Sequence, residues 1–279
     1  MVSRHDWLSD ATARLAAAGC EDAAFDARCL LEDVGGMPRG HMADDTPLTA
    51  EQETVLNHAL AQRAAGRPLQ YILGEWEFLT LTLKVGEGVL IPRPDTELLC
   101  EVAAEHLRGK AAPRVLDLCA GSGCVGLGVA SLCPDALVTE VELSDKALPY
   151  LRHNVTRYPD YAVTVRRADV LTDFAAFDGT YDAILSNPPY IPTADLSTLQ
   201  REVQHEPQMA LDGDADGLKF YRTIAEHWCE KLSDDGFVAV EVGIGQAADV
   251  AALFAAQGLE NTEVFTDLGG VERVVLARK

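Results

Sequence analysis

The sequence has few basic residues for its length. It contains 23 Lys and Arg against 44 Asp and Glu, which gives a formal net charge of −21. A surface of this charge repels polyanions, so proteins that wrap DNA or bind membranes through basic patches are disfavoured. The amino terminus also lacks an apolar signal core, and the longest uncharged stretch, residues 118–134, is rich in Gly and Ser. We therefore expect no membrane interaction and no direct contact with nucleic acid.

The cysteines form no CxxC pair, and their number, seven, is odd. A zinc site or a disulfide framework is therefore not expected, and a reducing cytoplasm fits this composition. We expect no metal. Hydrophobic residues make up 48% of the chain, which is enough to bury a core in one or two domains.

Hydrophobic periodicity divides the chain into three segments. Residues 1–67 carry apolar side chains at spacings of three and four, and Thr49 followed by Gln52 is typical of a helix capping box. This segment predicts a small all-helical N-terminal domain. In residues 68–94 the period changes to two between glycines, which predicts a β-hairpin linker.

Residues 95–279 alternate short apolar runs with helical stretches, a pattern typical of an α/β fold with a mainly parallel, doubly wound sheet. We expect strands at residues 115–118, 137–143, 162–167, 181–186, 237–242, 262–266 and 271–277.

A loop of small residues follows the first of these strands, and it reads Cys119-Ala120-Gly121-Ser122-Gly123. Small residues let the backbone pass close to a ligand, and the amides of the following helix point into that space. An adenosine-type cofactor is expected there. The dinucleotide fingerprint is not met, because Cys119 and Cys124 stand at two of its glycine positions. Neither cysteine has an adjacent His or Lys, so both are interpreted as small packing residues.

Carboxylates end the next two strands. Glu142 closes the second strand about twenty residues after the loop and can accept both ribose hydroxyls of a cofactor. Asp169, followed by Val170, closes the third strand, where an adenine amino group would lie. A single carboxylate at a strand end is more often a solvated cap, but several on consecutive strands favour a binding site.

The fourth strand runs directly into Asn187-Pro188-Pro189-Tyr190. Two prolines remove two amide donors and force extended backbone before each of them, so this edge presents acceptors only. We expect the Asn187 side-chain oxygen and the Pro188 carbonyl to face a planar NH2 group, with the Tyr190 ring covering it. Such an edge orients a poorly nucleophilic amide or amine nitrogen toward an electrophilic methyl group.

These features together resemble class I S-adenosylmethionine-dependent methyltransferases, and among them the peptide chain release factor glutamine methyltransferases of the HemK/PrmC type. The more specific resemblance is in Ile91-Pro-Arg-Pro-Asp-Thr-Glu combined with Asn187-Pro-Pro-Tyr, supported by residues 67–78, Glu206-Pro207, Asp216-Gly-Leu and Glu272-Arg273. It covers nearly the whole chain. The resemblance implies a Rossmann-like, seven-stranded methyltransferase sheet.

The resemblance also implies an activity and a set of roles. A methyl group would pass from S-adenosylmethionine to the side-chain amide nitrogen of the glutamine in the Gly-Gly-Gln motif of release factors. Residues 119–123 would line the methionine part of the cofactor, Glu142 would bind its ribose, and Asp169 with Val170 would flank the adenine. Asn187 would also contact the cofactor. Asn187, Pro188, Pro189 and Tyr190 would hold the glutamine, with Asn187, Pro188 and Tyr190 as catalytic residues. We further expect a monomer whose N-terminal helices dock the protein substrate.

The sequence leaves open three alternative functions and the roles of Arg93 and of residues 212–216. An adenine-N6 DNA methyltransferase needs the same acceptor edge, but the net charge disfavours it. A ribosomal-protein glutamine methyltransferase would share every catalytic residue, and a non-catalytic nucleotide-binding module would bind cofactor without methyl transfer. Arg93 is either a solvated turn residue or orders the site. The acidic run 212–216 lacks the spacing of a calcium loop and is interpreted as a mobile loop near the site.

Overall fold

The computed structural model describes residues 2–41 and 43–279, and the chain forms two compact units. The first unit reaches Glu75 and also includes Gln200–His205. The second consists of Trp76–Leu199 and Glu206–Lys279. The hairpin predicted as a linker thus lies mostly in the second unit. No helix within the described ranges is long and apolar enough to cross a membrane.

The first unit is helical, as the periodicity predicts. Its helices are α1 (Arg4–Ala17), α2 (Ala23–Cys29), α3 (Ala50–Ala64) and α4 (Leu69–Leu73), and α2 continues into a π-helical turn, Leu30–Val34. The capping box is confirmed, because Thr49 Oγ1 accepts the Gln52 amide and Gln52 Oε1 accepts the Thr49 amide, each at 3.1 Å. The short helix α4 was not predicted, since five residues do not establish a helical period.

A buried arginine holds the late segment Gln200–His205 in this unit. Arg63 is 7% exposed, and its guanidinium donates to Asp26 at 2.6 Å and to Glu202 at 2.8 Å. Arg201 donates to the Ala64 carbonyl at 2.9 Å. Because a buried charge needs a partner, the Asp26 and Glu202 carboxylates hold Arg63 on two sides and join segments that are distant in sequence.

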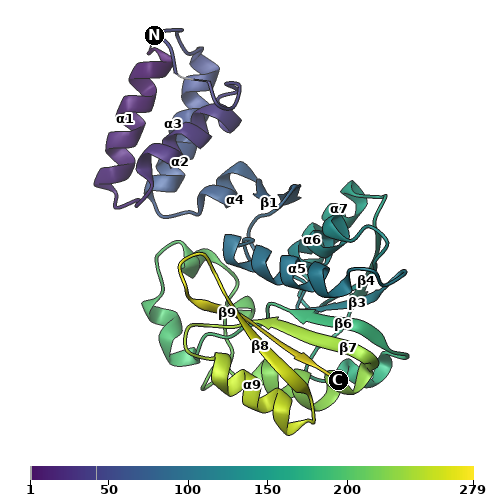
Figure 1. Ribbon diagram of the computed structural model, residues 1–279. Helices are drawn as coiled ribbons and strands as arrows, with labels where there is room; N and C mark the ends of the chain where they lie inside the picture. Colours follow the sequence, from purple (N-terminus) through teal and green to yellow (C-terminus); the bar gives the residue numbers. More distant parts are fainter. Residues whose placement is uncertain (1, 42) are drawn as a thin grey trace. The chain divides into compact units, whose positions relative to one another are not determined.

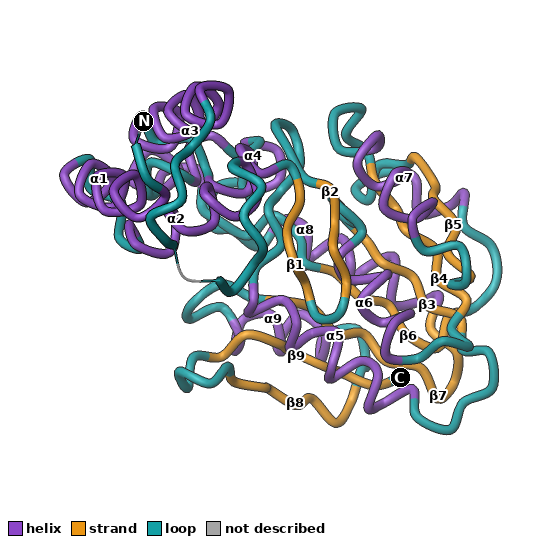
Figure 2. The backbone as a smooth tube through the Cα atoms, turned by 90° about the horizontal axis from the view of Figure 1, so that it is seen from above, coloured by secondary structure: helices purple, strands orange, loops and turns teal. Residues whose placement is uncertain are grey.

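The β-hairpin prediction is confirmed by strands β1 (Glu75–Phe78) and β2 (Leu81–Lys84). Viewed as in Figure 2, the hairpin lies over the helices that cover one face of the main sheet. Asn154 Oδ1 accepts the Lys84 amide at 2.7 Å, and Tyr158 Oη accepts the Thr82 amide at 2.7 Å. The hairpin is therefore attached to the second unit by backbone hydrogen bonds as well as by its buried apolar side chains.

The second unit contains one seven-stranded sheet. Its strands are β3 (Arg114–Leu118), β4 (Leu137–Glu142), β5 (Ala162–Arg167), β6 (Tyr181–Ser186), β7 (Leu232–Glu241), β8 (Glu260–Thr266) and β9 (Glu272–Arg278). The order across the sheet is β5-β4-β3-β6-β7-β9-β8. All neighbours are parallel except that β9 runs antiparallel to β7 and β8. The predicted mainly parallel, Rossmann-like sheet is confirmed.

Helices cover both faces of this sheet (Figure 1). They are α5 (Pro94–Leu107), α6 (Cys124–Leu132), α7 (Leu148–Arg157), α8 (Lys219–Thr223) and α9 (Ala247–Ala256). On one face, side chains of α5 and α6 such as Leu99 and Leu127 pack on the sheet. On the other face, Trp228 and Phe254 lie in a second core. The strands β6, β7 and β9 are buried over most of their length, which explains their apolar runs, whereas β5 and β8 at the two edges of the sheet are largely exposed.

The topology fixes where a ligand can bind. From β3 the chain moves outward through β4 and β5, then returns to the other side of β3 with β6. In open α/β sheets, ligands bind outside the carboxyl ends of the strands at such a reversal. The predicted loop 119–123 follows β3 and the segment 187–190 follows β6, so both lie at this point.

Candidate active site

A cavity of about 400 Å³ lies at the carboxyl ends of the strands in the second unit. Most of the predicted site residues line it, namely Cys119, Ala120, Gly121, Ser122, Glu142, Asp169, Val170, Asn187 and Pro189. Gly123, Pro188 and Tyr190 are not among the lining residues. The roles assigned to all these residues remain predictions, but residues from four different strand ends share one cavity.

The loop after β3 turns sharply beneath this cavity. Cys119, Gly121 and Gly123 have positive φ angles of 63°, 57° and 83°. Ala120 donates its amide to the Val141 carbonyl at 3.0 Å, which holds the loop against β4. Gly121 and Gly123 adopt this backbone without strain, whereas Cys119 does so against the preference of a residue with a Cβ. The turn places the Gly121 amide beside β4.

Glu142 closes the far side of this turn. Its Oε2 accepts the Gly121 amide at 2.8 Å, and its Oε1 accepts the Ser144 amide at 2.6 Å. Burial raises the pKa of the Glu142 carboxyl, and the two amide hydrogen bonds partly oppose that shift. Each carboxylate oxygen retains an acceptor position, so the residue fits the two neighbouring hydroxyls of a ribose. The ribose role of Glu142 stays a prediction.

Asp169 lies at the end of the next strand and lines the cavity together with Val170 and Leu171. Its Oδ1 accepts the Leu171 amide at 2.9 Å, and its own amide donates to Asp173. These bonds shape a turn and fix the direction of the Asp169 side chain. The apolar Val170 is 4% exposed, so it offers a packed surface next to the carboxylate.

Two further carboxyl groups lie beneath the loop, outside the cavity lining. Asp117 and Glu140 are fully buried, and a Cβ on Gly126 would come within 2.5 Å of Glu140 Oε1. Burial raises the pKa of Asp117 to about 7 and raises that of Glu140 well above its ordinary value. The Gly126 amide donates to Asp117 Oδ2 at 3.0 Å, so this carboxyl also fixes the start of α6.

The Asn-Pro-Pro-Tyr segment is held firmly on both sides. Ser186 Oγ donates to the Leu118 carbonyl at 2.6 Å, which ties the end of β6 to β3. The Tyr190 carbonyl accepts Gln246 Nε2 at 3.0 Å. Gly217, at φ +75°, approaches that carbonyl so closely that a Cβ would lie 2.3 Å from it. The acceptor edge is therefore a fixed element rather than a flexible turn.

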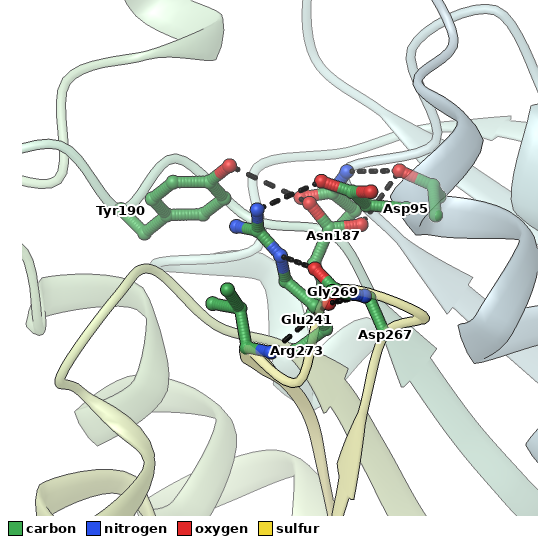
Figure 3. Close-up of polar contacts among 9 residues, drawn as sticks. Asp95, Asn187, Tyr190, Glu241, Asp267, Gly269 and Arg273 are labelled. Atoms are coloured by element: carbon green, nitrogen blue, oxygen red, sulfur yellow. Dashed lines mark hydrogen bonds and ion pairs between the residues drawn. The ribbon is translucent and has the colours of Figure 1, made fainter.

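Asn187 and Tyr190 contact a buried polar network that sequence reasoning missed. Asn187 Nδ2 donates to Thr96 Oγ1 at 3.1 Å, and Thr96 Oγ1 donates to Glu241 Oε2 at 2.6 Å. Tyr190 Oη approaches Glu241 Oε1 at 3.4 Å (Figure 3). The tyrosine hydroxyl is thus directed toward Glu241, at the end of β7. Arg273 lies in the same close-up.

Arg273 is the cation of this network. It forms ion pairs with Asp95 at 2.9 Å and with Asp267 at 3.0 Å. Burial raises the pKa of Glu241 to about 7, an effect that Asp95 increases and that Arg273 and the Thr96 and Tyr190 hydroxyls oppose. Thr96, Asp95 and Arg273 lie in segments quoted for the family resemblance, whereas Glu241 carries no such signal.

Arg93 proves to be part of the site's framework. Its guanidinium pairs with the buried carboxylate of Glu206, whose other oxygen accepts the Ile91 amide at 2.9 Å. Arg93, Ile91 and the neighbouring Pro207 line the cavity. The interpretation of Arg93 as a residue that orders the site is favoured over that of a solvated turn residue, because Glu206 joins two cavity walls through it.

The acidic run 212–216 is organised by its own turns. Asp212 Oδ1 accepts Thr193 Oγ1 at 2.6 Å and the Asp214 amide at 3.0 Å. Asp214 pairs with Lys219, and Asp216 pairs with Arg222. Within residues 2–41 and 43–279, no group of three or more His, Cys, Asp or Glu side chains could hold a metal ion. Asp212, Asp214 and Lys219 line the cavity, which agrees with a loop near the site.

The two loop cysteines are poor nucleophiles in this environment. Burial raises the pKa of the Cys119 and Cys124 thiols well above the ordinary value, and the Asp117 carboxyl adds to the shift in both. Since the thiolate is the reactive form, neither residue is suited to covalent catalysis. Their interpretation as packing residues is favoured.

Comparison with known proteins decides the family. Residues 6–74 match the PrmC N-terminal domain, and residues 95–211 match the methyltransferase small domain. A release factor glutamine methyltransferase of Geobacter sulfurreducens is 40% identical over 267 residues, covering 95% of this chain and 92% of the relative. The chain belongs to the release factor glutamine methyltransferase family.

A second relative agrees with this assignment, and a solved structure agrees with the fold. The release factor glutamine methyltransferase of Rhodospirillum rubrum is 39% identical, covering 95% of this chain and 82% of the relative. A methyltransferase structure from Pyrococcus furiosus has a TM-score of 0.52 at 15% identity, covering 80% of this chain and 98% of that one. The latter likeness shows the fold alone. The predicted family, enzyme class and methyltransferase fold are confirmed.

Proposed function

We propose that this family member transfers a methyl group from S-adenosylmethionine to the side-chain amide nitrogen of the glutamine in the Gly-Gly-Gln motif of release factors. The observation that carries the proposal is the sharing of one cavity by two features. The acceptor edge at Asn187 and Pro189 lines the same cavity as Glu142 and the loop after β3. A donor and an acceptor of a methyl group would therefore meet inside it.

The residues around the loop fit S-adenosylmethionine. Its sulfonium supplies a methyl carbon that is open to attack by a nucleophile. An ionised Glu142 carboxylate would accept the ribose hydroxyls with the lone pairs that the Gly121 and Ser144 amides leave available. Asp169 would accept from the adenine amino group, and Val170 would pack against the ring. The backbone of residues 119–123 leaves room for the methionine part, because no large side chain projects from this turn.

The acceptor edge acts on the glutamine. An amide nitrogen is a weak nucleophile because its lone pair is delocalised into the carbonyl. Asn187 Oδ1 would accept one of its hydrogens, and the carbonyl of Pro188, which is not itself among the lining residues, would accept the other. These contacts would orient the lone pair toward the methyl carbon and stabilise positive charge as it develops on nitrogen. The N–CH3 bond would form as the S–CH3 bond of the sulfonium breaks, and S-adenosylhomocysteine would leave as a neutral thioether. The proton becomes acidic only as the nitrogen becomes cationic and would then pass to water, so no strong base is needed before attack.

None of the described residues of the helical first unit lines this cavity. We therefore assign it the docking of the intact release factor. On this basis its removal affects recognition of the protein substrate, while cofactor binding stays with the second unit.

The test is incubation with S-adenosylmethionine labelled in the methyl group. Purified release factors, ribosomal proteins and DNA are supplied separately, and the label is mapped by mass spectrometry. We expect label on the Gly-Gly-Gln glutamine and none on a release factor in which that glutamine is replaced by asparagine.

Two outcomes would overturn the proposal. Label on DNA or on a ribosomal protein, with the release factor unmodified, would identify a different substrate for the same site. Cofactor binding by calorimetry without transfer to any of the three would indicate a binding module.

A further inference from the structure

Asn187 has two chemically different ends on its side-chain amide, and only one of them can accept a hydrogen bond from a substrate. In the structure Nδ2 donates to Thr96 Oγ1, and no described residue donates a hydrogen bond to Oδ1. Because nitrogen and oxygen have nearly the same shape, the surrounding hydrogen bonds must decide which end faces the cavity.

The hydroxyl of Thr96 makes that decision. A hydroxyl has one hydrogen, and Thr96 gives it to Glu241 Oε2 at 2.6 Å. An ionised carboxylate can only accept, so the direction of this bond is fixed. Thr96 Oγ1 can then only accept from its other neighbour, which must present Nδ2. The Asn187 oxygen is left for the cavity that Asn187 lines.

We propose that Thr96 and Glu241 are positioning residues that hold the Asn187 amide with its oxygen toward the substrate glutamine. This proposal rests on the methyl transfer proposed above. Glu241 is 2% exposed and is not among the residues that line the cavity, so it acts through Thr96 rather than on the substrate. Thr96 is 1% exposed, which keeps water from replacing its hydroxyl.

The hydrogen bonds that run from Asn187 through Thr96 to Glu241 depend on the charge of Glu241. The groups near it are Asp95, Thr96 and Cys100 from α5, Cys124 from α6, Tyr190 after β6, Tyr221 from α8 and Arg273 from β9. If Glu241 gains a proton, its carboxyl can donate to Thr96, and Thr96 can then donate to Asn187 Oδ1. The amide would turn, and its NH2 would face the NH2 of the glutamine. Methyl transfer should therefore decline in acid as Glu241 is protonated.

The test of this proposal compares Thr96→Val, Thr96→Ser and Glu241→Gln with the wild type. Single-turnover methylation of a release factor is measured at saturating cofactor. Thr96→Val removes the hydroxyl at nearly constant shape, and we expect a rate about 10- to 100-fold lower, below the loss for a directly contacting group. Thr96→Ser keeps the hydroxyl and should restore most of the rate. Glu241→Gln should slow transfer and flatten the acid limb of the pH profile.

A double variant shows whether Thr96 acts by positioning Asn187 or by stabilising the protein in general. In Asn187→Ala protein there is no amide to orient, so adding Thr96→Val should cause little further loss. An equal loss in both backgrounds would overturn the proposal, and so would a Thr96→Val protein as fast as the wild type.

A third readout needs no substrate. In protein labelled with ¹⁵N on asparagine side chains, one Asn187 Nδ2 hydrogen should exchange slowly with water, and this protection should disappear in Thr96→Val. Asn187→Ala assigns the signal. A wild-type hydrogen that exchanges as fast as those of exposed asparagines would refute the orientation. This measurement decides the orientation even if release factors prove not to be the substrate.

Discussion

Replacement of Glu142 by alanine should weaken cofactor binding strongly while leaving the choice of methyl acceptor unchanged. The carboxylate is 9% exposed and accepts the Gly121 and Ser144 amides. Its remaining lone pairs are the ones that we expect to accept the two ribose hydroxyls. Hydrogen bonds to a charged group contribute about 1.5–3 kcal/mol each, but water partly replaces them in an alanine variant.

The expected loss is about 1.5–3 kcal/mol in total, which corresponds to a dissociation constant about 10- to 150-fold higher. Glu142→Gln is the finer probe, because the amide keeps one acceptor oxygen and turns a donor toward one hydroxyl or one backbone amide. We expect Glu142→Gln to lie between the wild type and Glu142→Ala. Titration calorimetry with S-adenosylmethionine and with S-adenosylhomocysteine measures both variants.

Asp145→Ala is the matched control. Asp145 belongs to the same loop, its side chain is 78% exposed, and it pairs with Arg167 rather than lining the cavity. This variant removes one negative charge without removing the ribose acceptor, so its affinity should stay within about twofold of the wild type, as expected for an exposed ion pair. A folded Glu142→Ala protein with unchanged affinity would refute the assignment of Glu142 to the ribose.

Three further predictions follow from the same geometry. Asn187→Ala should lower single-turnover methyl transfer about a hundredfold or more, and Asn187→Asp, which keeps an acceptor, should retain more activity; an alanine variant at wild-type rate would leave the segment a simple turn. The raised pKa of Glu241, about 7, means that the folded protein holds a proton that the unfolded chain releases near pH 4.5, so this group's stabilising contribution is present below that pH and is lost as the pH rises to about 7. Denaturant unfolding should therefore show a weaker loss of stability between pH 5 and 7 in Glu241→Gln than in the wild type, and equal slopes would contradict the shift. Removal of residues 1–66 should raise KM for the intact release factor and leave the calorimetric affinity for cofactor unchanged; unaltered KM would exclude a docking role.

The sequence was sufficient to predict the residues that follow consecutive strands of the sheet. Glu142 ends β4, Asn187 comes directly after β6 and Asp169 lies two residues after β5, and parallel strands bring such positions to one edge. Periodicity also predicted six strands to within two residues of their ends. The exception is β7, which begins at Leu232, five residues before the predicted start. The first residues of β7 include the exposed Asp234 and Asp235, which interrupt the apolar run by which a buried strand is recognised in a sequence.

The residues that orient Asn187 could not be predicted in the same way. Thr96 lies in the first turn of α5, where a threonine is ordinary, and Glu241 ends β7 as other carboxylates end other strands. Their role depends on the hydrogen bond between Thr96 and Glu241, which are 145 residues apart in the sequence. Periodicity describes which face of an element is buried, but it does not say which polar groups of distant elements meet. The Ile-Pro-Arg-Pro-Asp-Thr-Glu run was a signal for Thr96 through family resemblance alone.

A buried carboxylate at Glu241 is costly, and its chemistry explains why a neutral residue would not serve equally well. A glutamine would offer both a donor and an acceptor to Thr96, so the hydroxyl could point either way and Asn187 could adopt either orientation. An ionised carboxylate offers acceptors only and leaves one arrangement. Arg273, itself held between Asp95 and Asp267, offsets part of the burial cost. Glu241 therefore offers only hydrogen-bond acceptors to Thr96. The two prolines have the same effect at the cavity edge, because they lack amide donors and leave acceptors for the donor groups of the substrate.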